Sequence, residues 1–234
     1  MDNSVVLADY LDNSVHPKPH VESLRSYYYR DLQHIVAHIV LKEASVVHFG
    51  SRLGNLLASL PNRMTLGVEA SKKLVSKARE KYRRIHFIYA PLYNHTVKQQ
   101  FDVILITHLF SYISDVQRFV AQLHRLCFEK SRVVVVSFNF FWKPVLDLVS
   151  FLGLRVKLPF EPNWLSEHDV ENLFHLEGFE LVKEEKRMLF PLYIPVISEL
   201  LNRYVSQLPV FNSLCLTTIQ IFRKVPSVKN FSIS

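Results

Sequence analysis

The order of apolar and polar positions divides most of the chain into two recurring patterns. Over residues 22–40 apolar side chains recur at helical spacing, which predicts an amphipathic helix. Further helices are predicted over residues 55–60, 72–84 and 116–128. Short, largely apolar runs predict strands over residues 45–49, 64–68, 85–89, 101–107 and 132–138. Strands without alternation are typical of a parallel sheet covered by helices on both faces, so the pattern predicts a doubly wound, Rossmann-like α/β fold.

The last third of the chain departs from this order. A helix is predicted over residues 166–177, with Ser166 as N-cap, Asp169 in a capping-box position and Gly178 as the stop. Two further strands are predicted over residues 179–187 and 214–223. Between them, residues 189–211 contain three prolines and two charged residues, which argues against a membrane span. We expect the apolar residues of this segment to cover the core, with a partner or a membrane surface as the alternatives: Ile194, Ile197, Leu200, Leu201 and Tyr204.

Composition and charge narrow the class of protein. The 234 residues are 49% hydrophobic, enough for one substantial core, and we expect a single domain over residues 22–224 between an N-terminal extension (1–21) and a C-terminal tail (225–234). The polar start of the chain lacks a signal-peptide pattern, which predicts a cytoplasmic location. Cys127 and Cys215 are predicted to be buried thiols rather than a disulfide.

The net charge of +7 comes mostly from residues 72–84, where seven basic residues stand against Glu80 alone. Apolar residues at helical spacing share this stretch, so we interpret it as a surface helix with a solvated basic face, and nucleic acid is not an expected partner. An RNA-associated enzyme is the alternative that this helix leaves open. His34 and His38 lack a third ligand nearby, so no metal site is predicted, and no Walker or G-x-S-x-G motif is present.

Two short stretches suggest a nucleoside ligand. The turn Gly50-Ser51-Arg52-Leu53-Gly54 follows the first strand and precedes a helix, where glycine lets a ligand approach the backbone. Glu69 ends the second strand, where a carboxylate can accept hydrogen bonds from ribose hydroxyls. Because G-x-G-x-x-G is missing, a nucleoside without pyrophosphate is favoured over a dinucleotide.

The stretches VVHFGSRLGNLL, LGVEAS, FDVILITHLFSYISDVQRF and RVVVVSFNFFWKP resemble the class I S-adenosylmethionine-dependent methyltransferases, and the resemblance runs from about Tyr28 to Lys224. NWLSEHDVENLFHLEGFELV and residues 190–216 are similar to bacterial methyltransferases found beside or fused to glycosyltransferases. The resemblance implies seven strands with an antiparallel last pair, S-adenosylmethionine as cofactor, and a glycosyltransferase as a candidate partner.

Carried onto this chain, the resemblance implies a set of cofactor-binding residues: His48, Gly50, Ser51, Arg52, Gly54, Glu69, Ala70, Pro91, Leu92 and Thr107. The chain departs from the family at three places. His48 replaces an acid, Arg52 replaces a glycine, and Ala90-Pro91 stands where an acid near the adenine is usual. These departures motivate an alternative function, a methyltransferase-like binding or regulatory module with weakened or lost cofactor binding.

Methyl transfer from a sulfonium requires alignment of donor and acceptor, and a hydroxyl acceptor must also lose its proton. His108 is the candidate base, although a packing role is its simpler interpretation. Tyr112, Asn139 and Trp142 are candidate acceptor contacts, while Asn139 could equally stabilise a turn. The predicted function is methyl transfer to a small-molecule or saccharide-containing acceptor, with peripheral membrane contact left open.

Overall fold

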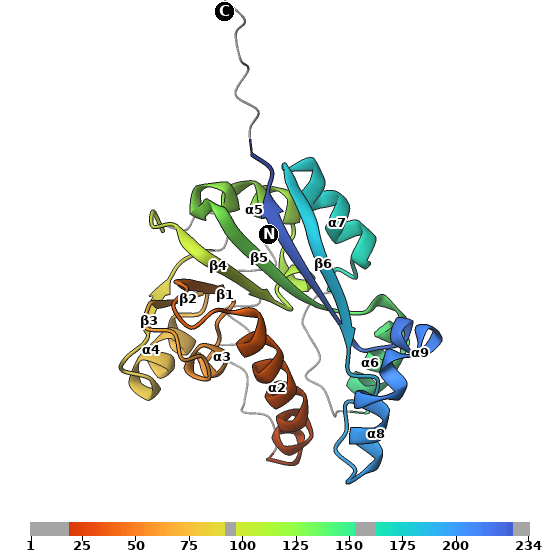
Figure 1. Cartoon of the computed structure of the whole chain (residues 1–234). Helices are drawn as coiled ribbons and strands as arrows, with labels where there is room; N and C mark the ends of the chain where they lie inside the picture. The colour runs from red at the N-terminus through yellow and green to blue at the C-terminus, as the bar shows by residue number, and fades with distance from the viewer. Residues whose placement is uncertain (1–18, 92–96, 153–161, 227–234) are drawn as a thin grey trace, which may run out of the picture.

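The computed structural model describes residues 19–91, 97–152 and 162–226. In these residues seven strands form one mixed sheet in the order β3-β2-β1-β4-β5-β7-β6 (Figure 1). The strands β1 to β5 are parallel, and β7 lies antiparallel between β5 and β6. Their bounds are β1 Val46–Phe49, β2 Thr65–Glu69, β3 His86–Tyr89, β4 Phe101–Thr107, β5 Cys127–Phe138, β6 Phe179–Arg187 and β7 Thr217–Lys224.

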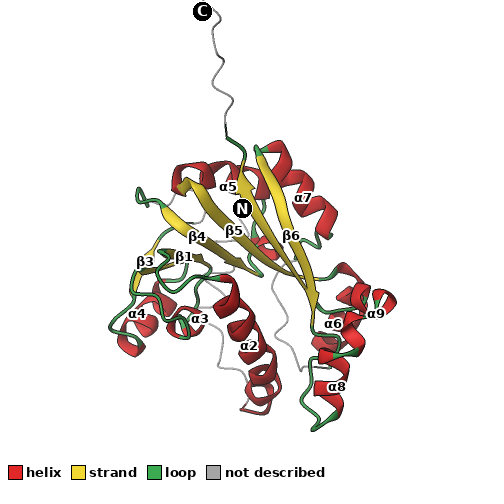
Figure 2. Cartoon of the chain, viewed as in Figure 1, coloured by secondary structure: helices red, strands yellow, loops and turns green. Residues whose placement is uncertain are grey.

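Helices cover both faces of this sheet (Figure 2). The α-helices of the described residues are α2 Pro19–Ile39, α3 Asn55–Ala58, α4 Lys72–Lys81, α5 Val116–Leu123, α6 Lys143–Phe151, α7 Glu167–Leu176, α8 Ile197–Arg203 and α9 Pro209–Ser213. Short 3₁₀ turns are η1 Phe110–Tyr112, η2 His124–Leu126, η3 Phe140–Trp142 and η4 Val205–Gln207. The expected doubly wound fold with an antiparallel C-terminal pair is confirmed.

Two hydrophobic clusters hold the layers together. On one face Val46 and Val134 pack with apolar residues of α2, α3 and α4. On the other face Val47 and Val133 pack with residues of α5 and α7. Adjacent residues of one strand thus pack against helices on opposite faces of the sheet. This is why the strands are apolar throughout. Cys127 and Cys215 are both buried free thiols, as expected.

One predicted boundary is wrong. The helix expected over residues 116–128 ends at Leu123, and β5 begins at Cys127. Cys127 pairs with Phe101 of β4, and Gln100 donates to its carbonyl. Pairing with β4 therefore outweighs the helical spacing of the apolar residues here, and the short turn η2 absorbs the change of direction.

The expectation that the apolar residues of 189–211 cover the core is also wrong. Ile194, Ile197, Leu200 and Tyr204 are exposed, and Leu201 is half-buried. Helix α8 instead turns Ser198 inward, where its hydroxyl accepts from the Ile194 N–H and donates to the Leu192 carbonyl. A small polar residue fills the inner side of this helix, which leaves its long apolar side chains on the surface.

Candidate functional site

The turn between β1 and α3, residues 50–54, is here named the glycine turn. Gly50, Arg52 and Gly54 have φ angles of +72°, +50° and +76°. Glycine adopts this region readily, but a side chain there costs about 1 kcal/mol or more. Gly54 has a second constraint, because a Cβ would lie 2.4 Å from the Phe87 ring. The turn is therefore a strained, tightly packed connection in which arginine occupies a conformation suited to glycine.

Glu69, at the carboxyl end of β2, faces this turn. One carboxylate oxygen accepts from the Arg52 N–H at 2.8 Å, and the other accepts from the N–H groups of Ala70 and Ser71 at 2.8 and 3.3 Å. The side chain is buried. Burial raises its pKa above the usual range, while these hydrogen bonds and the Arg52 charge act in the opposite direction. Glu69 thus ties β2 to the glycine turn.

The Arg52 side chain is exposed, so it does not occupy the space between the glycines and Glu69. Its backbone supplies the hydrogen bond to the carboxylate, and its guanidinium contributes charge. The arginine side chain therefore points to solvent. Only its positive charge would act on a ligand at the turn.

His48 is a buried histidine in the middle of the sheet. Burial lowers its pKa to about 4, so it is neutral at pH 7. Its Nε2 lies 2.8 Å from the Thr107 hydroxyl at the end of β4. Its Nδ1 and the Ser51 hydroxyl oxygen are buried atoms without a hydrogen-bond partner in the described part of the chain. Such atoms are uncommon in folded proteins and indicate a missing partner.

These observations test whether the site fits the predicted cofactor. A carboxylate accepts about four hydrogen bonds, and Glu69 uses three, so one acceptor position is left for a ribose hydroxyl. The two unsatisfied atoms of His48 and Ser51 flank the same turn. A neutral His48 also avoids placing a second positive charge beside a sulfonium. The residues present fit S-adenosylmethionine, with Arg52 as the one unfavourable charge.

His108 directly follows Thr107, at the same edge of the sheet. It has a positive φ of +53°, and its ring stacks on Phe138 with centroids 4.0 Å apart. The Tyr28 hydroxyl of α2 lies 2.6 Å from His108 Nε2 and accepts from Thr217 at 3.4 Å. Because burial raises the pKa of Tyr28, its hydroxyl stays protonated and can donate to Nε2 when His108 carries its proton on Nδ1.

Sequence reasoning missed Tyr28 and Thr217. Both are 80 or more positions from their partners in this network, and Tyr28 belongs to the apolar face of α2. No local signal distinguishes its hydroxyl from that of any core tyrosine.

The three candidate acceptor residues follow β4 and β5. Tyr112 is half-buried in η1. Asn139 is buried, and its amide donates to the carbonyls of Ser213 and Cys215 while its oxygen accepts from the Phe141 N–H. Trp142 donates from Nε1 to the Leu214 carbonyl at 2.7 Å. The contacts of Asn139 are those of a turn-stabilising residue, the simpler of its two interpretations.

The adenine side of the site is described in part. Ala70 is half-buried beside Glu69, and Pro91 is exposed after β3. Ala90 is buried, and its N–H donates to the Glu69 carbonyl. Leu92 lies outside the described residues.

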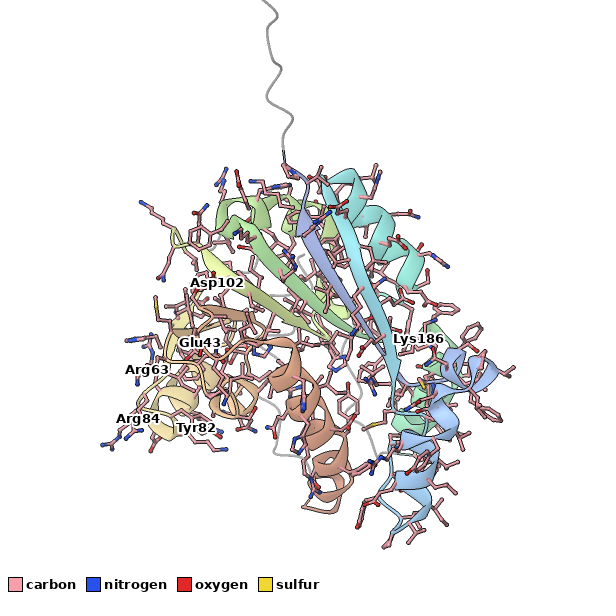
Figure 3. All side chains as sticks on the ribbon, in the orientation of Figure 1. Glu43, Arg63, Tyr82, Arg84, Asp102 and Lys186 are labelled. Atoms are coloured by element: carbon pink, nitrogen blue, oxygen red, sulfur yellow. The ribbon has the colours of Figure 1, made fainter. Side chains whose placement is uncertain are left out.

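Other polar regions lie away from this site. A shallow depression of about 560 Å³ is lined by Glu43, Ser45 and Asp102 among others, at the amino ends of β1 and β4 (Figure 3). Ligands of open α/β sheets bind at the opposite, carboxyl edge. No group of three or more His, Cys, Asp or Glu residues within the described ranges could hold a metal ion.

Comparisons with known proteins agree with this geometry. Residues 47–135 match the model of a methyltransferase domain family. Over these residues the chain is similar to a methyltransferase domain. The matched residues run from β1 into β5, and so include the glycine turn, Glu69 and His108. No curated protein sequence matches the chain.

Solved structures similar to this chain extend the likeness in fold. A Thermotoga maritima methyltransferase, described as a possible histamine N-methyltransferase, has a TM-score of 0.69 at 15% identity, covering 95% of this chain and 99% of that one. Magnesium protoporphyrin IX methyltransferase from Synechocystis, solved with bound SAH, has a TM-score of 0.65 at 14% identity. The match covers 95% of this chain and 100% of that one. A Haloferax volcanii protein, a putative methyltransferase in complex with the Trm112 activator, has a TM-score of 0.67 at 11% identity. The match covers 88% of this chain and 93% of that one.

Proposed function

We propose that this protein transfers a methyl group from S-adenosylmethionine to a nucleophilic atom of a small-molecule or saccharide-containing acceptor. The observation that carries the cofactor site is the Glu69 carboxylate, held 2.8 Å from the Arg52 N–H beside unsatisfied polar atoms of His48 and Ser51. Small acceptors are supported by two structural relatives, one described for histamine and one for magnesium protoporphyrin IX. The saccharide part rests on the resemblance alone.

The chain's own residues supply binding and orientation. When bound, the cofactor supplies an electrophilic methyl group on a sulfonium. Glu69 would accept from a ribose hydroxyl, and the glycine turn would let the methionine part approach the backbone closely. His48 stays neutral and offers Nδ1 as a hydrogen-bonding atom. Aligning donor and acceptor provides most of the rate enhancement, as is usual for a displacement between two bound reactants.

We propose His108 as the proton acceptor for a hydroxyl substrate. Its Nε2 lies 2.6 Å from the Tyr28 hydroxyl, so the acceptor hydroxyl would take the place of the Tyr28 hydroxyl or pass its proton through it. In both cases Tyr28 and Thr217 hold the imidazole in the tautomer whose Nε2 accepts a proton. An amine acceptor would need no such base in its neutral form.

Calorimetric titration of the full chain with S-adenosylmethionine and with its demethylated product tests the cofactor site. We expect both to bind, and Glu69→Ala to weaken affinity at least about 100-fold, because it removes the ribose acceptor and releases the glycine turn. Glu80→Ala, an exposed acid on α4, is the matched control and should leave affinity unchanged. Absence of heat for the wild type at about 1 mM ligand would reject the proposal.

The second candidate function is a binding or regulatory module with weakened cofactor affinity. Arg52 in a glycine conformation and His48 in place of an acid favour it. It predicts no heat for the wild type but measurable binding by the double variant Arg52→Gly/His48→Asp. A glycosyltransferase partner and a cytoplasmic location are proposed from the sequence alone. No helix in the described ranges is long and apolar enough to cross a membrane.

A further inference from the structure

The helix α4 and the turn after it carry a positive charge that nearby acids do not neutralise. Residues 72–84 hold seven basic residues and one acid, Glu80. Among the residues that the structure describes, no acidic side chain forms an ion pair with five of these cations, all of them exposed: Lys72, Arg79, Lys81, Arg83 and Arg84. Their charge is therefore available to a partner at the surface.

A hollow beside this helix combines cations with an aromatic ring. It has a volume of about 340 Å³, and its lining residues are here named the basic hollow: Lys72, Val75, Ser76, Arg79 and Tyr89. Tyr89, at the end of β3, is 47% exposed, and the Lys72 ammonium lies over its ring at 5.2 Å from the centroid. An exposed ring among the cations is what a merely solvated basic face would lack, and it changes the interpretation of this helix.

Both cations of the hollow are held in place. The Arg79 guanidinium donates from Nε and Nη2 to the Phe87 carbonyl at 3.0 and 2.6 Å, which leaves its other N–H groups for a ligand. Lys72 is held by its contact with the Tyr89 ring. An arginine fixed in this way is suited to bind a phosphate group. The hollow thus offers phosphate-binding donors next to a ring on which a base can stack.

Further cations continue this surface beyond the hollow. Arg83 and Arg84 follow α4 and are exposed, and the exposed Arg63 precedes β2. Because Leu66 of β2 pairs with His86 of β3, Arg63 and Arg84 project from neighbouring strand ends (Figure 3). The cations thus follow α4 over about 15 Å, the length of its ten residues. A row of this length matches a polymer with repeated phosphates better than a single phosphate group.

A membrane surface is a poorer match for this face. A helix that lies in a bilayer interface turns a wide apolar face toward the lipid. In α4 the apolar residues Val75 and Ala78 are buried, and Leu74 is half-buried. Positive charge without an outward apolar helix face favours a nucleic-acid strand over a bilayer.

We propose that the basic hollow and the cations along α4 bind a single-stranded nucleic acid. A base stacks on Tyr89, while Lys72 and Arg79 contact the neighbouring phosphates. In the sheet order β3-β2-β1-β4, two strands separate this face from β4, so the hollow lies about 14 Å from the strand that leads to His108. The nucleotides in the hollow are therefore docked rather than methylated, and their binding can be measured without the cofactor and independently of the proposed function.

Fluorescence anisotropy of the full chain with a labelled oligouridylate of about twelve nucleotides, at about 50 mM salt, tests the proposal. The wild type should bind, and its affinity should fall as salt rises because phosphate contacts release counterions. Lys72→Gln/Arg79→Gln should lose at least about tenfold in affinity, and the log–log salt slope should become shallower by about 1.4, which corresponds to two phosphate contacts. The matched control, Arg125→Gln/Lys130→Gln, removes two exposed cations elsewhere and should bind as the wild type does.

A second set of variants tests the ring and guards against misfolding. Tyr89→Ala should weaken binding about tenfold, because a base loses its stacking partner. Phe128→Ala removes a ring of similar exposure, 46% against 47%, and should leave binding unchanged. Lys72→Glu/Ser76→Glu changes two exposed positions, leaves Arg79 in place and should abolish binding. Circular dichroism establishes that each variant is folded.

Three results would overturn the proposal. The first is a wild type that does not bind the oligonucleotide at this salt concentration. The second is an equal loss in the variants of the hollow and their controls, which would show diffuse attraction to a positively charged chain. The third is binding to phosphatidylglycerol vesicles that Lys72→Gln/Arg79→Gln loses while it keeps its affinity for the oligonucleotide, which would assign these cations to a membrane surface.

Discussion

The cofactor half of the molecule and its acceptor half are built in different ways. In the first, the buried carboxylate at the end of β2 accepts a hydrogen bond from the glycine turn that follows β1. In the second, α6, α8 and α9 leave their large apolar residues exposed. In the proposed function the first half holds the cofactor, whereas the second faces the acceptor.

The Tyr28–His108 pair is where the two halves meet. If His108 is the proton acceptor, His108→Asn should lower kcat by about 100-fold with a hydroxyl acceptor and leave the cofactor dissociation constant within about twofold. Tyr28→Phe removes the donor to Nε2 but keeps the ring, so the acidic limb of the kcat–pH profile should move. If His108 only packs against its neighbours, the acidic limb should not move in either variant. Both variants should then differ from the wild type only in a lower free energy of unfolding.

His48 makes the stability of the cofactor half dependent on pH. Its pKa is about 4 when folded, against about 6.5 in an unfolded chain, so between these values the unfolded chain binds the extra proton. The stabilisation is complete above about pH 6.5 and is lost as pH falls. We expect a loss of about 2 kcal/mol between about pH 7 and pH 5, measured by urea denaturation.

The variant His48→Asn isolates this effect. It should show a smaller decrease over the same interval, since asparagine does not titrate. The raised pKa of Glu69 gives a contribution of opposite sign, with stability falling as pH rises, but it is common to both proteins and cancels in the comparison. Equal slopes for the two proteins would show that the buried imidazole is not what protonates on unfolding.

The contrast between the halves also explains what could be read from the sequence. The strands, the glycine turn and Glu69 were predictable because each depends on a few adjacent residues whose order follows a known topology. The pair Tyr28–His108 was not, since hydrogen bonding between residues 80 positions apart leaves no local pattern. The exposed face of α8 was misjudged because apolar spacing identifies a face but not its direction, and here Ser198 occupies the inner side.

Trp142 offers a change confined to the acceptor half. Trp142→Phe keeps most of the apolar packing but removes the donor to the Leu214 carbonyl. We expect a decrease of about 1 kcal/mol in the free energy of unfolding, with cofactor affinity unchanged. A loss of cofactor affinity instead would show that the two halves are coupled more closely than their contacts indicate.

Substitutions of Arg52 should have the smallest effects on stability and cofactor affinity, and they test the glycine turn directly. Arg52→Gly relieves a positive φ of +50° but makes the unfolded chain more flexible, so these two terms, each about 1 kcal/mol, should nearly cancel in stability. Removing the exposed charge should raise affinity for the cationic cofactor by only about threefold, since solvent screens it. Arg52→Asn, which tolerates the same φ, should give the same gain by calorimetry. A loss of affinity in both variants would mean that the guanidinium pairs with the methionine carboxylate, so that this arginine compensates for the glycine it replaces.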